Sequence, residues 1–368
     1  MNRNFSITKF LLITLLVFFL LDILIGKFIY KKFIRIQLPD TGPSHIAYDE
    51  IFDHKLLKNL KQTAGWGNIR YTVCTDSNGF INSCKNQFDN LKKFDIGFIG
   101  DSFTEGVGLN YEETFVGIIS SELKNLKIAN LAVSSYSPSI YYSKINFLLS
   151  RGYNFKEIIV FVDISDLFDD TTCYKLKNNI IQRRETVSLC NLEVNPKNNF
   201  ELFLRKRLRL SVEFFYLIKH KLYQYGFLSY EPPVKIIKNT RSGWTHNYKA
   251  ENYNNLKYNE ATSILKKNMG NLAKLLKNNN IDLSIAVYPW PETLKFDSEK
   301  NKHVKLWKDF CNENCKNFYN FMPIFFSLLE KEKFSNLYQR IYFKDDVHFN
   351  KEGNKIIAKQ FLHFYKQN

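Results

Sequence analysis

Short apolar runs alternate with longer amphipathic segments along the last three quarters of the chain. The apolar runs predict five β-strands, at residues 96–99, 127–133, 158–163, 283–288 and 317–321. The segments between and after them predict helices at residues 112–123, 138–149, 255–278, 301–311 and 351–365. Strands that alternate with helices predict an α/β fold, a doubly wound parallel sheet with helices on both faces.

Three serines and one aromatic loop fall at the ends of predicted strands. They are Ser102, Ser135, Ser165 and the loop after Tyr288. Ligands of a doubly wound sheet bind beyond the carboxyl ends of its strands. The sequence therefore predicts one shared site at this edge of the sheet.

Ser102 follows the first strand in the segment FDIGFIGDSFTE, residues 94–105. Gly100 ends the apolar run, so Ser102 is expected on the turn between a strand and a helix. Such a turn lifts a hydroxyl group off the sheet and lets backbone N–H groups face a developing oxyanion. The alternative for this serine is an ordinary turn residue or helix cap.

Asp345 and His348 lie near the C-terminus, three residues apart. A short turn can bring the Asp345 carboxylate to one imidazole nitrogen, which leaves the other nitrogen to take a proton from Ser102. The alternative is an ordinary turn before the last helix, with Asn350 as its cap.

The GDS segment after the first strand and the DxxH segment before the last helix together resemble the SGNH (GDSL-type) hydrolases. The resemblance runs from about residue 93 to the C-terminus, and it is closest to a membrane-anchored bacterial branch linked to acylation of cell-surface polysaccharides. It implies a flavodoxin-like three-layer sandwich, a triad of Ser102, His348 and Asp345, and no cofactor.

The resemblance also implies an oxyanion hole made by Ser102, Ser135 and Ser165, and here the sequence departs from the family. Ser135 stands where the family has a glycine, and Ser165 stands where it has an asparagine. Losing one oxyanion donor costs on the order of a hundred- to a thousand-fold in rate. A catalytically silent glycan-binding or assembly protein with the same fold is therefore the alternative function.

Other candidate residues follow the third and fourth strands. Tyr288 and Trp290 are candidates for stacking on a sugar, or for a rigid turn. An acidic cluster is interpreted as helix caps and surface charge rather than a metal site, because its spacing matches no known calcium loop; its members are Asp163, Asp166, Asp169 and Asp170. The remaining histidines are interpreted as surface or packing residues: His45, His54, His220, His246, His303 and His363.

The N-terminal part of the chain predicts a membrane anchor. Residues 10–30 are almost continuously apolar, long enough for one transmembrane helix after a cytoplasmic segment at 1–9. A linker and small irregular region follow at 31–92, and the hydrolase-like domain occupies 93–368. That domain carries an insertion at about 171–250, in which residues 200–225 are amphipathic and basic.

The six cysteines form three pairs that are close in sequence: Cys74 with Cys84, Cys173 with Cys190, and Cys311 with Cys315. Such pairs predict disulfides and a domain outside the cytoplasm. The lysines and arginines that follow the apolar segment favour the opposite orientation, so a cytoplasm-facing lipid esterase is a further alternative.

The formal net charge is +16, yet no zinc-finger spacing, RNP-like pattern or long basic tail favours nucleic-acid binding. We expect a membrane-anchored periplasmic serine esterase or O-acyltransferase that acts on a cell-surface glycan. Its expected partners are an acylated glycan or acyl donor, the membrane, and a membrane-bound protein that supplies acyl groups.

Overall fold

The structure is a computed structural model. It describes residues 3–26, 45–66, 69–86, 89–183, 241–246 and 256–367, and the single residues 207, 208, 210, 211, 214 and 218. The chain divides into two compact units, which are considered separately. One comprises Met1–Ser44 and Asn191–Glu231, and the other His45–Cys190 and Pro232–Asn368.

Helix α1 (Arg3–Leu21) lies in the first unit and is followed by a wider π-helical turn, η1 (Asp22–Gly26). In the described part of the chain, no helix combines the length and apolar character that crossing a membrane requires. This finding does not support the transmembrane helix predicted at residues 10–30, of which residues 27–30 lie outside the described residues. Most of the predicted amphipathic segment, residues 200–225, lies outside the described residues.

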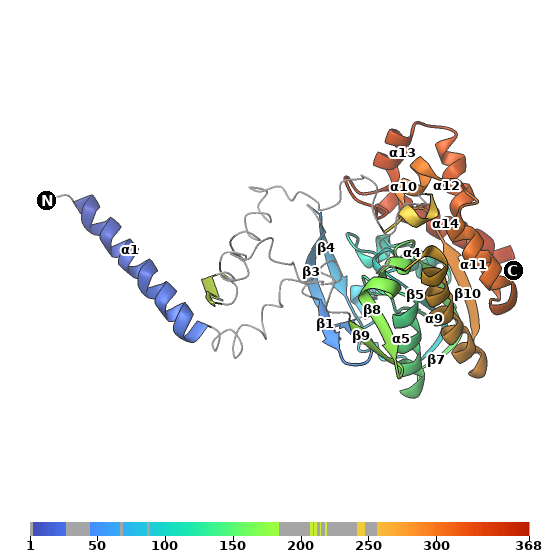
Figure 1. Cartoon of the computed structure of the whole chain (residues 1–368), viewed down its shortest axis with the longest axis horizontal. Helices are drawn as coiled ribbons and strands as arrows, with labels where there is room; N and C mark the ends of the chain where they lie inside the picture. The colour runs from blue at the N-terminus through green and yellow to red at the C-terminus, as the bar shows by residue number, and fades with distance from the viewer. Residues whose placement is uncertain are drawn as a thin grey trace. The chain divides into compact units, whose positions relative to one another are not determined.

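Five parallel strands in the order β11-β10-β7-β5-β6 form the central sheet of the second unit. Their bounds are β5 (Lys93–Gly100), β6 (Ile128–Asn130), β7 (Asn154–Val162), β10 (Asp282–Val287) and β11 (Asn317–Asn320). Figure 1 labels β5, β7 and β10 of this sheet. The five predicted strands are confirmed. Strands β5 and β7 are buried almost throughout, which explains why they read as continuous apolar runs rather than alternating ones.

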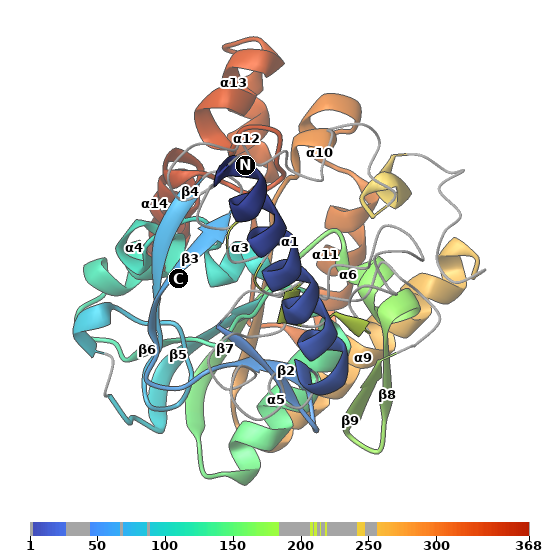
Figure 2. The same ribbon diagram turned by 90° about the vertical axis from the view of Figure 1, so that its left-hand side faces the viewer.

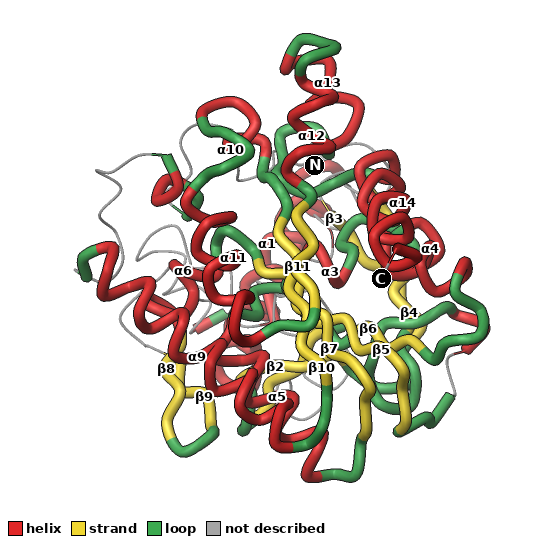
Figure 3. Tube along the Cα trace, turned by 90° about the vertical axis from the view of Figure 1, so that its right-hand side faces the viewer, coloured by secondary structure: helices red, strands yellow, loops and turns green. Residues whose placement is uncertain are grey.

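Helices cover both faces of this sheet, as Figure 3 shows. On one face lie α5 (Pro138–Ser150), α9 (Tyr258–Asn278) and α11 (Lys302–Asn314), and on the other lie α4 (Phe115–Glu122) and α14 (Lys351–Gln367). These helices confirm the predicted ones except at the start of α4. There a separate 3₁₀ turn, η4 (Tyr111–Glu113), precedes α4, because the Thr114 side chain caps the helix by accepting from Gly117 N.

Three antiparallel strand pairs and three short helices were not predicted as such. The pairs are β1 (Ile46–Asp49) with β2 (Asp53–Leu56), β3 (Lys61–Trp66) with β4 (Ile69–Cys74), and β8 (Tyr174–Lys177) with β9 (Ile180–Arg183). The helices are α10 (Pro291–Phe296), α12 (Met322–Leu329) and α13 (Phe334–Ile341). Figure 2 shows the β8–β9 hairpin beside α5. The described residues between 45 and 92 thus fold together with the sheet.

Two of the three predicted disulfides are present, Cys74–Cys84 and Cys311–Cys315. Cys173 also belongs to a disulfide, but Cys190 lies outside the described residues, so that pairing stays a prediction.

We predict that Phe98→Ala lowers the free energy of unfolding by about 3–5 kcal/mol, because it empties a fully buried ring site. Phe98 is 0% exposed, and its ring packs against those of Phe115, Phe161 and Phe361. Urea unfolding measures the change. Tyr48→Ala, at a side chain that is 74% exposed, is the control and should cost about 0.5 kcal/mol. Equal losses in the two variants would contradict this packing.

Candidate active site

Ser102 begins the short helix α3 (Ser102–Glu105) directly after strand β5. A Cβ atom on Gly100 would lie 2.3 Å from Thr104 Oγ1 and 2.9 Å from the Phe161 carbonyl oxygen, so only glycine fits at the last strand position. Asp101 then caps the helix, with its Oδ1 accepting from Phe103 N at 3.0 Å. The strand, the glycine and the cap together place the Ser102 hydroxyl group at the carboxyl edge of the sheet.

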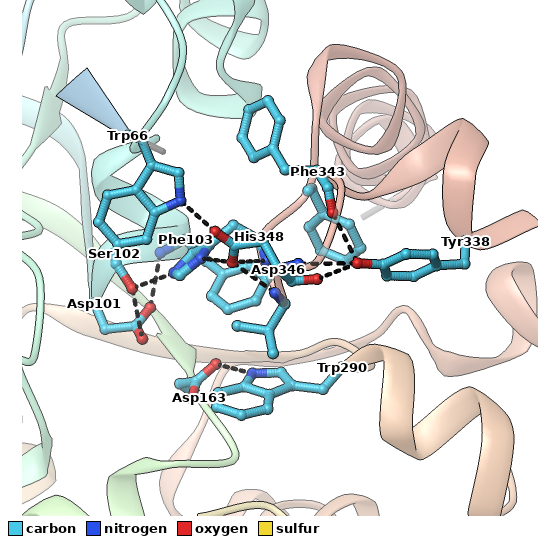
Figure 4. A network of polar contacts seen from close by, with 12 residues as sticks. Trp66, Asp101, Ser102, Phe103, Asp163, Trp290, Tyr338, Phe343, Asp346 and His348 are labelled. Atoms are coloured by element: carbon cyan, nitrogen blue, oxygen red, sulfur yellow. Dashed lines mark hydrogen bonds and ion pairs between the residues drawn. The ribbon is translucent and has the colours of Figure 1, made fainter. Parts of the chain in front are cut away.

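His348 lies against Ser102 although 246 residues separate them. Ser102 Oγ is 2.7 Å from His348 Nε2, and the same hydroxyl is 3.3 Å from Asp101 Oδ2 (Figure 4). The structure therefore brings together the serine and the histidine that the sequence singled out.

The carboxylate on the imidazole belongs to Asp346, so the predicted assignment to Asp345 is wrong. Asp346 Oδ1 lies 2.6 Å from His348 Nδ1. Asp345 is exposed and has a left-handed backbone, with φ at 57°. This conformation makes a tight turn, closed by a hydrogen bond from Phe343 N to the His348 carbonyl oxygen, so the following side chain points at the ring.

Asp346 is held in its charged form. Burial alone would raise its pKa, but the charge of His348 and hydrogen bonds from His348 and Trp66 lower the pKa below the ordinary value. Its Oδ1 also accepts from the backbone N–H groups of Val347 and His348. The arrangement can fix one tautomer of His348 and stabilise the imidazolium ion that forms when Ser102 loses its proton.

Two of the three predicted oxyanion donors, Ser102 and Ser135, have distinctive backbone positions. Ser102 is the first residue of α3, where N–H groups have no partner within the helix. Ser135 adopts φ of 64°, so it takes the left-handed conformation that a glycine would adopt readily. The hydroxyl group of the third predicted donor, Ser165, is buried, and its Oγ lies 3.5 Å from Asp169 Oδ2.

The turn that carries Ser135 is clamped through its neighbour, Ser134. Glu105 Oε2 accepts from Ser134 N at 2.5 Å and from Ser134 Oγ at 2.7 Å. His54 Nε2 is 2.7 Å from the Ser134 carbonyl oxygen, and His45 Nε2 is 3.1 Å from Glu105 Oε1. His45 and His54 are therefore buried polar anchors of this turn, and their interpretation as surface or packing residues was incomplete.

Tyr288 and Trp290 do not present open ring faces. They are 1% and 4% exposed, and both donate to Asp163 Oδ2, at 2.8 Å and 2.7 Å. Their predicted role in stacking on a sugar is wrong for this conformation, because protein covers the rings. They stabilise a buried carboxylate below the site.

The predicted acidic cluster is buried rather than on the surface. Burial, followed by repulsion from neighbouring carboxylates, raises the pKa of Asp101 and of Asp166 well above the ordinary value. Burial also raises the pKa of Asp170, and that of Asp169 to about 6. Within the described residues, no three histidine, cysteine or acidic side chains are arranged to hold a metal ion.

Comparisons with known proteins give likeness to solved structures only. No family model matches the chain, and no curated protein matches it. A psychrotrophic esterase from Pseudoalteromonas sp. is 10% identical and aligns 75% of this chain with 98% of its own, with a TM-score of 0.38. A lipolytic protein of the G-D-S-L family from Veillonella parvula is 12% identical, with 74% and 99% covered and a TM-score of 0.39. A catalytic mutant of an acetylxylan esterase from Geobacillus stearothermophilus is 11% identical, with 74% and 93% covered and a TM-score of 0.38.

The two neighbouring aspartates give a direct test of the site. We expect Asp346→Asn to slow the labelling of Ser102 by a fluorophosphonate on the order of a thousand-fold, because an amide no longer fixes the imidazole tautomer. Asp345→Asn is the matched control and should change the rate by less than about twofold, since its exposed charge is screened by solvent. A larger effect at Asp345 would restore the original assignment.

Asp169 gives a prediction for stability against pH. Its pKa rises from 3.8 in the unfolded chain to about 6 in the folded one, so the folded state binds the extra proton. Its contribution to stability is therefore lost as the pH rises from about 4 through about 6. We compare the free energy of unfolding of Asp169→Asn with that of the wild type at two pH values. From pH 4.5 to pH 7.5, the difference should change by about 2 kcal/mol in favour of the variant. Urea unfolding at both pH values measures this, and a constant difference would contradict it.

Proposed function

We propose that this protein is an SGNH-type serine esterase or O-acyltransferase that works through an acyl-enzyme on Ser102. The observation that carries the proposal is the continuous relay from Ser102 Oγ through His348 to Asp346, with distances of 2.7 Å and 2.6 Å. A serine with a positioned base, itself oriented by a carboxylate, is the arrangement that activates a hydroxyl nucleophile.

The reaction follows from the roles of these three side chains. Ser102 Oγ attacks the ester carbonyl carbon while its proton passes to His348 Nε2. His348 then gives that proton to the departing alcohol oxygen as the carbonyl–oxygen bond breaks, which leaves an ester on Ser102. Water or a sugar hydroxyl group attacks this ester in the second half, with His348 again accepting and returning a proton.

The negative charge of the tetrahedral intermediate needs donors that are already in place. The N–H groups of Ser102 and Ser135 are the proposed pair, because one begins α3 and the other lies on the left-handed turn clamped by Glu105 and His54. With the Ser165 hydroxyl directed at Asp169, we infer a two-donor hole and a modest rate on simple esters.

The proposed substrate is an O-acyl, most simply O-acetyl, ester of a glycan. In support, a groove of about 560 Å³ lies between strand β4 and the start of α14. Its wall includes Phe343, whose N–H closes the turn that carries His348. Charged residues of both signs also line it, and two of its lysines are paired within the groove: Lys351 with Glu113 and Lys355 with Glu352. Such a polar wall suits the hydroxyl groups of a sugar chain.

We further propose that the enzyme works outside the cytoplasm. The two described disulfides support this, because disulfides form and persist in oxidising compartments. The apolar N-terminal segment is proposed as the means of attachment to the membrane. An acyl donor made inside the cell would then have to be delivered by a membrane-bound partner.

One observation favours the alternative of a silent glycan-binding protein, namely that the Ser165 hydroxyl group is buried beside Asp169 Oδ2, 3.5 Å away. Such a protein would bind its glycan equally well with Ser102 or His348 replaced by alanine, and it would turn over no ester.

We expect the wild-type protein to hydrolyse p-nitrophenyl acetate and to react with a fluorophosphonate, and Ser102→Ala to lose both activities. Ser121→Ala is the control, because Ser121 is an exposed serine near the end of α4; this variant should still label. Hydrolysis that persists unchanged in Ser102→Ala would rule out the acyl-enzyme mechanism.

A further inference from the structure

Trp66 reaches the proposed catalytic groups from a part of the chain remote from both Ser102 and His348. It ends strand β3, on the β3–β4 hairpin. Its Nε1–H donates to Asp346 Oδ2 at 2.5 Å, and its ring meets the His348 imidazole edge-on, with centroids 4.8 Å apart and an interplanar angle of 83° (Figure 4).

The two oxygens of Asp346 have different partners. Oδ1 takes the N–H groups of Val347 and His348 together with the imidazole Nδ1. Among the described residues, Oδ2 accepts only from Trp66. A carboxylate bound through one oxygen can still rotate about its Cβ–Cγ bond, whereas a donor on the second oxygen fixes its plane.

We propose that Trp66 is a positioning residue for the acyl-transfer reaction, in which its indole N–H locks Asp346 in the plane of the His348 imidazole. This inference rests on the proposed function. It makes the β3–β4 hairpin part of the active site. The hairpin is held by the Cys74–Cys84 disulfide and by a hydrogen bond from Thr72 N to Asn110 Oδ1.

The indole N–H also decides how strongly the His348–Asp346 pair holds its proton. Trp66 draws part of the carboxylate charge away from the imidazole, so removing the N–H leaves a more basic pair. The other titratable groups near this pair are Asp101, which accepts from Ser102 Oγ, and Tyr338, which donates to the Asp346 carbonyl oxygen. The adjacent Asp345 is exposed. These groups are unchanged in the variants below.

The test compares Trp66→Phe with the wild type in p-nitrophenyl acetate hydrolysis across pH. Phenylalanine keeps a ring beside His348 but has no N–H. We expect kcat to fall about tenfold with little change in KM, because the loss is one of orientation. We also expect the acidic limb of the kcat/KM profile to move to higher pH by about half a unit to one unit, which is the scale of one hydrogen bond.

The matched control is Trp307→Phe, which removes an indole N–H at a different site. Trp307 is fully buried in α11, and its Nε1 has no hydrogen-bond partner within the described residues. This variant should lose stability but keep the wild-type pH profile. If Trp66→Phe folds poorly, benzothienylalanine at position 66 keeps the shape of the indole and replaces its N–H by sulfur, and the same shift is expected.

The possible results separate this inference from the proposed function. A wild-type protein that neither hydrolyses the ester nor labels at Ser102 contradicts the proposed function itself. An active wild type with an unmoved acidic limb in both Trp66 variants overturns the role of Trp66 alone. The role of Trp66 is also overturned if the acidic limb of Trp66→Phe moves to lower pH, or if this variant loses no more kcat than Trp307→Phe does.

Discussion

The hydrogen bond between Ser102 and His348 depends on two turns that only particular backbones can make. At the end of β5, the space beside Gly100 excludes even a Cβ atom. Before α14, Asp345 takes a left-handed conformation, and the turn is closed between Phe343 and His348. Each turn sets the direction of one side chain, and the parallel sheet with its covering helices brings the two turns to the same edge. If either turn relaxed, the hydroxyl group and the imidazole would no longer face one another.

Side chains from the segment before the central sheet support the candidate site through hydrogen bonds. Trp66 contacts the acid, while His45 and His54 hold the turn that carries the proposed oxyanion donor. Leaving a buried polar group without a partner costs about 1–3 kcal/mol, so these contacts also tie the small strand pairs to the domain. The same interactions that stabilise residues 45–92 therefore position the groups proposed to react.

Buried acids beneath the nucleophile oppose this stability. Asp101, Asp166, Asp169 and Asp170 all have raised pKa values because burial disfavours their charged forms. Neighbouring side chains donate hydrogen bonds to several of these acids. Tyr141 donates to Asp166, and Asn268 donates to Asp170. Such an arrangement is costly at neutral pH, because either a carboxylate stays charged while buried or it must hold a proton that it would release in water.

Apolar periodicity and turn residues were enough to predict the strands and the main helices, whereas the pairing of Ser102 with His348 rested on the resemblance of two short segments to the SGNH hydrolases. A strand that is buried on both faces of a parallel sheet is apolar at nearly every residue, so the local sequence is enough to predict it. The local sequence does not distinguish Asp345 from Asp346 as the partner of His348. That choice depends on the rotation of one backbone unit within a turn closed by distant contacts. For the same reason the sequence did not show that Ser165 points at Asp169, that Tyr288 and Trp290 are covered, or that Trp66 reaches the acid. Each of these facts is a direction of a side chain, and the packing of remote segments sets that direction.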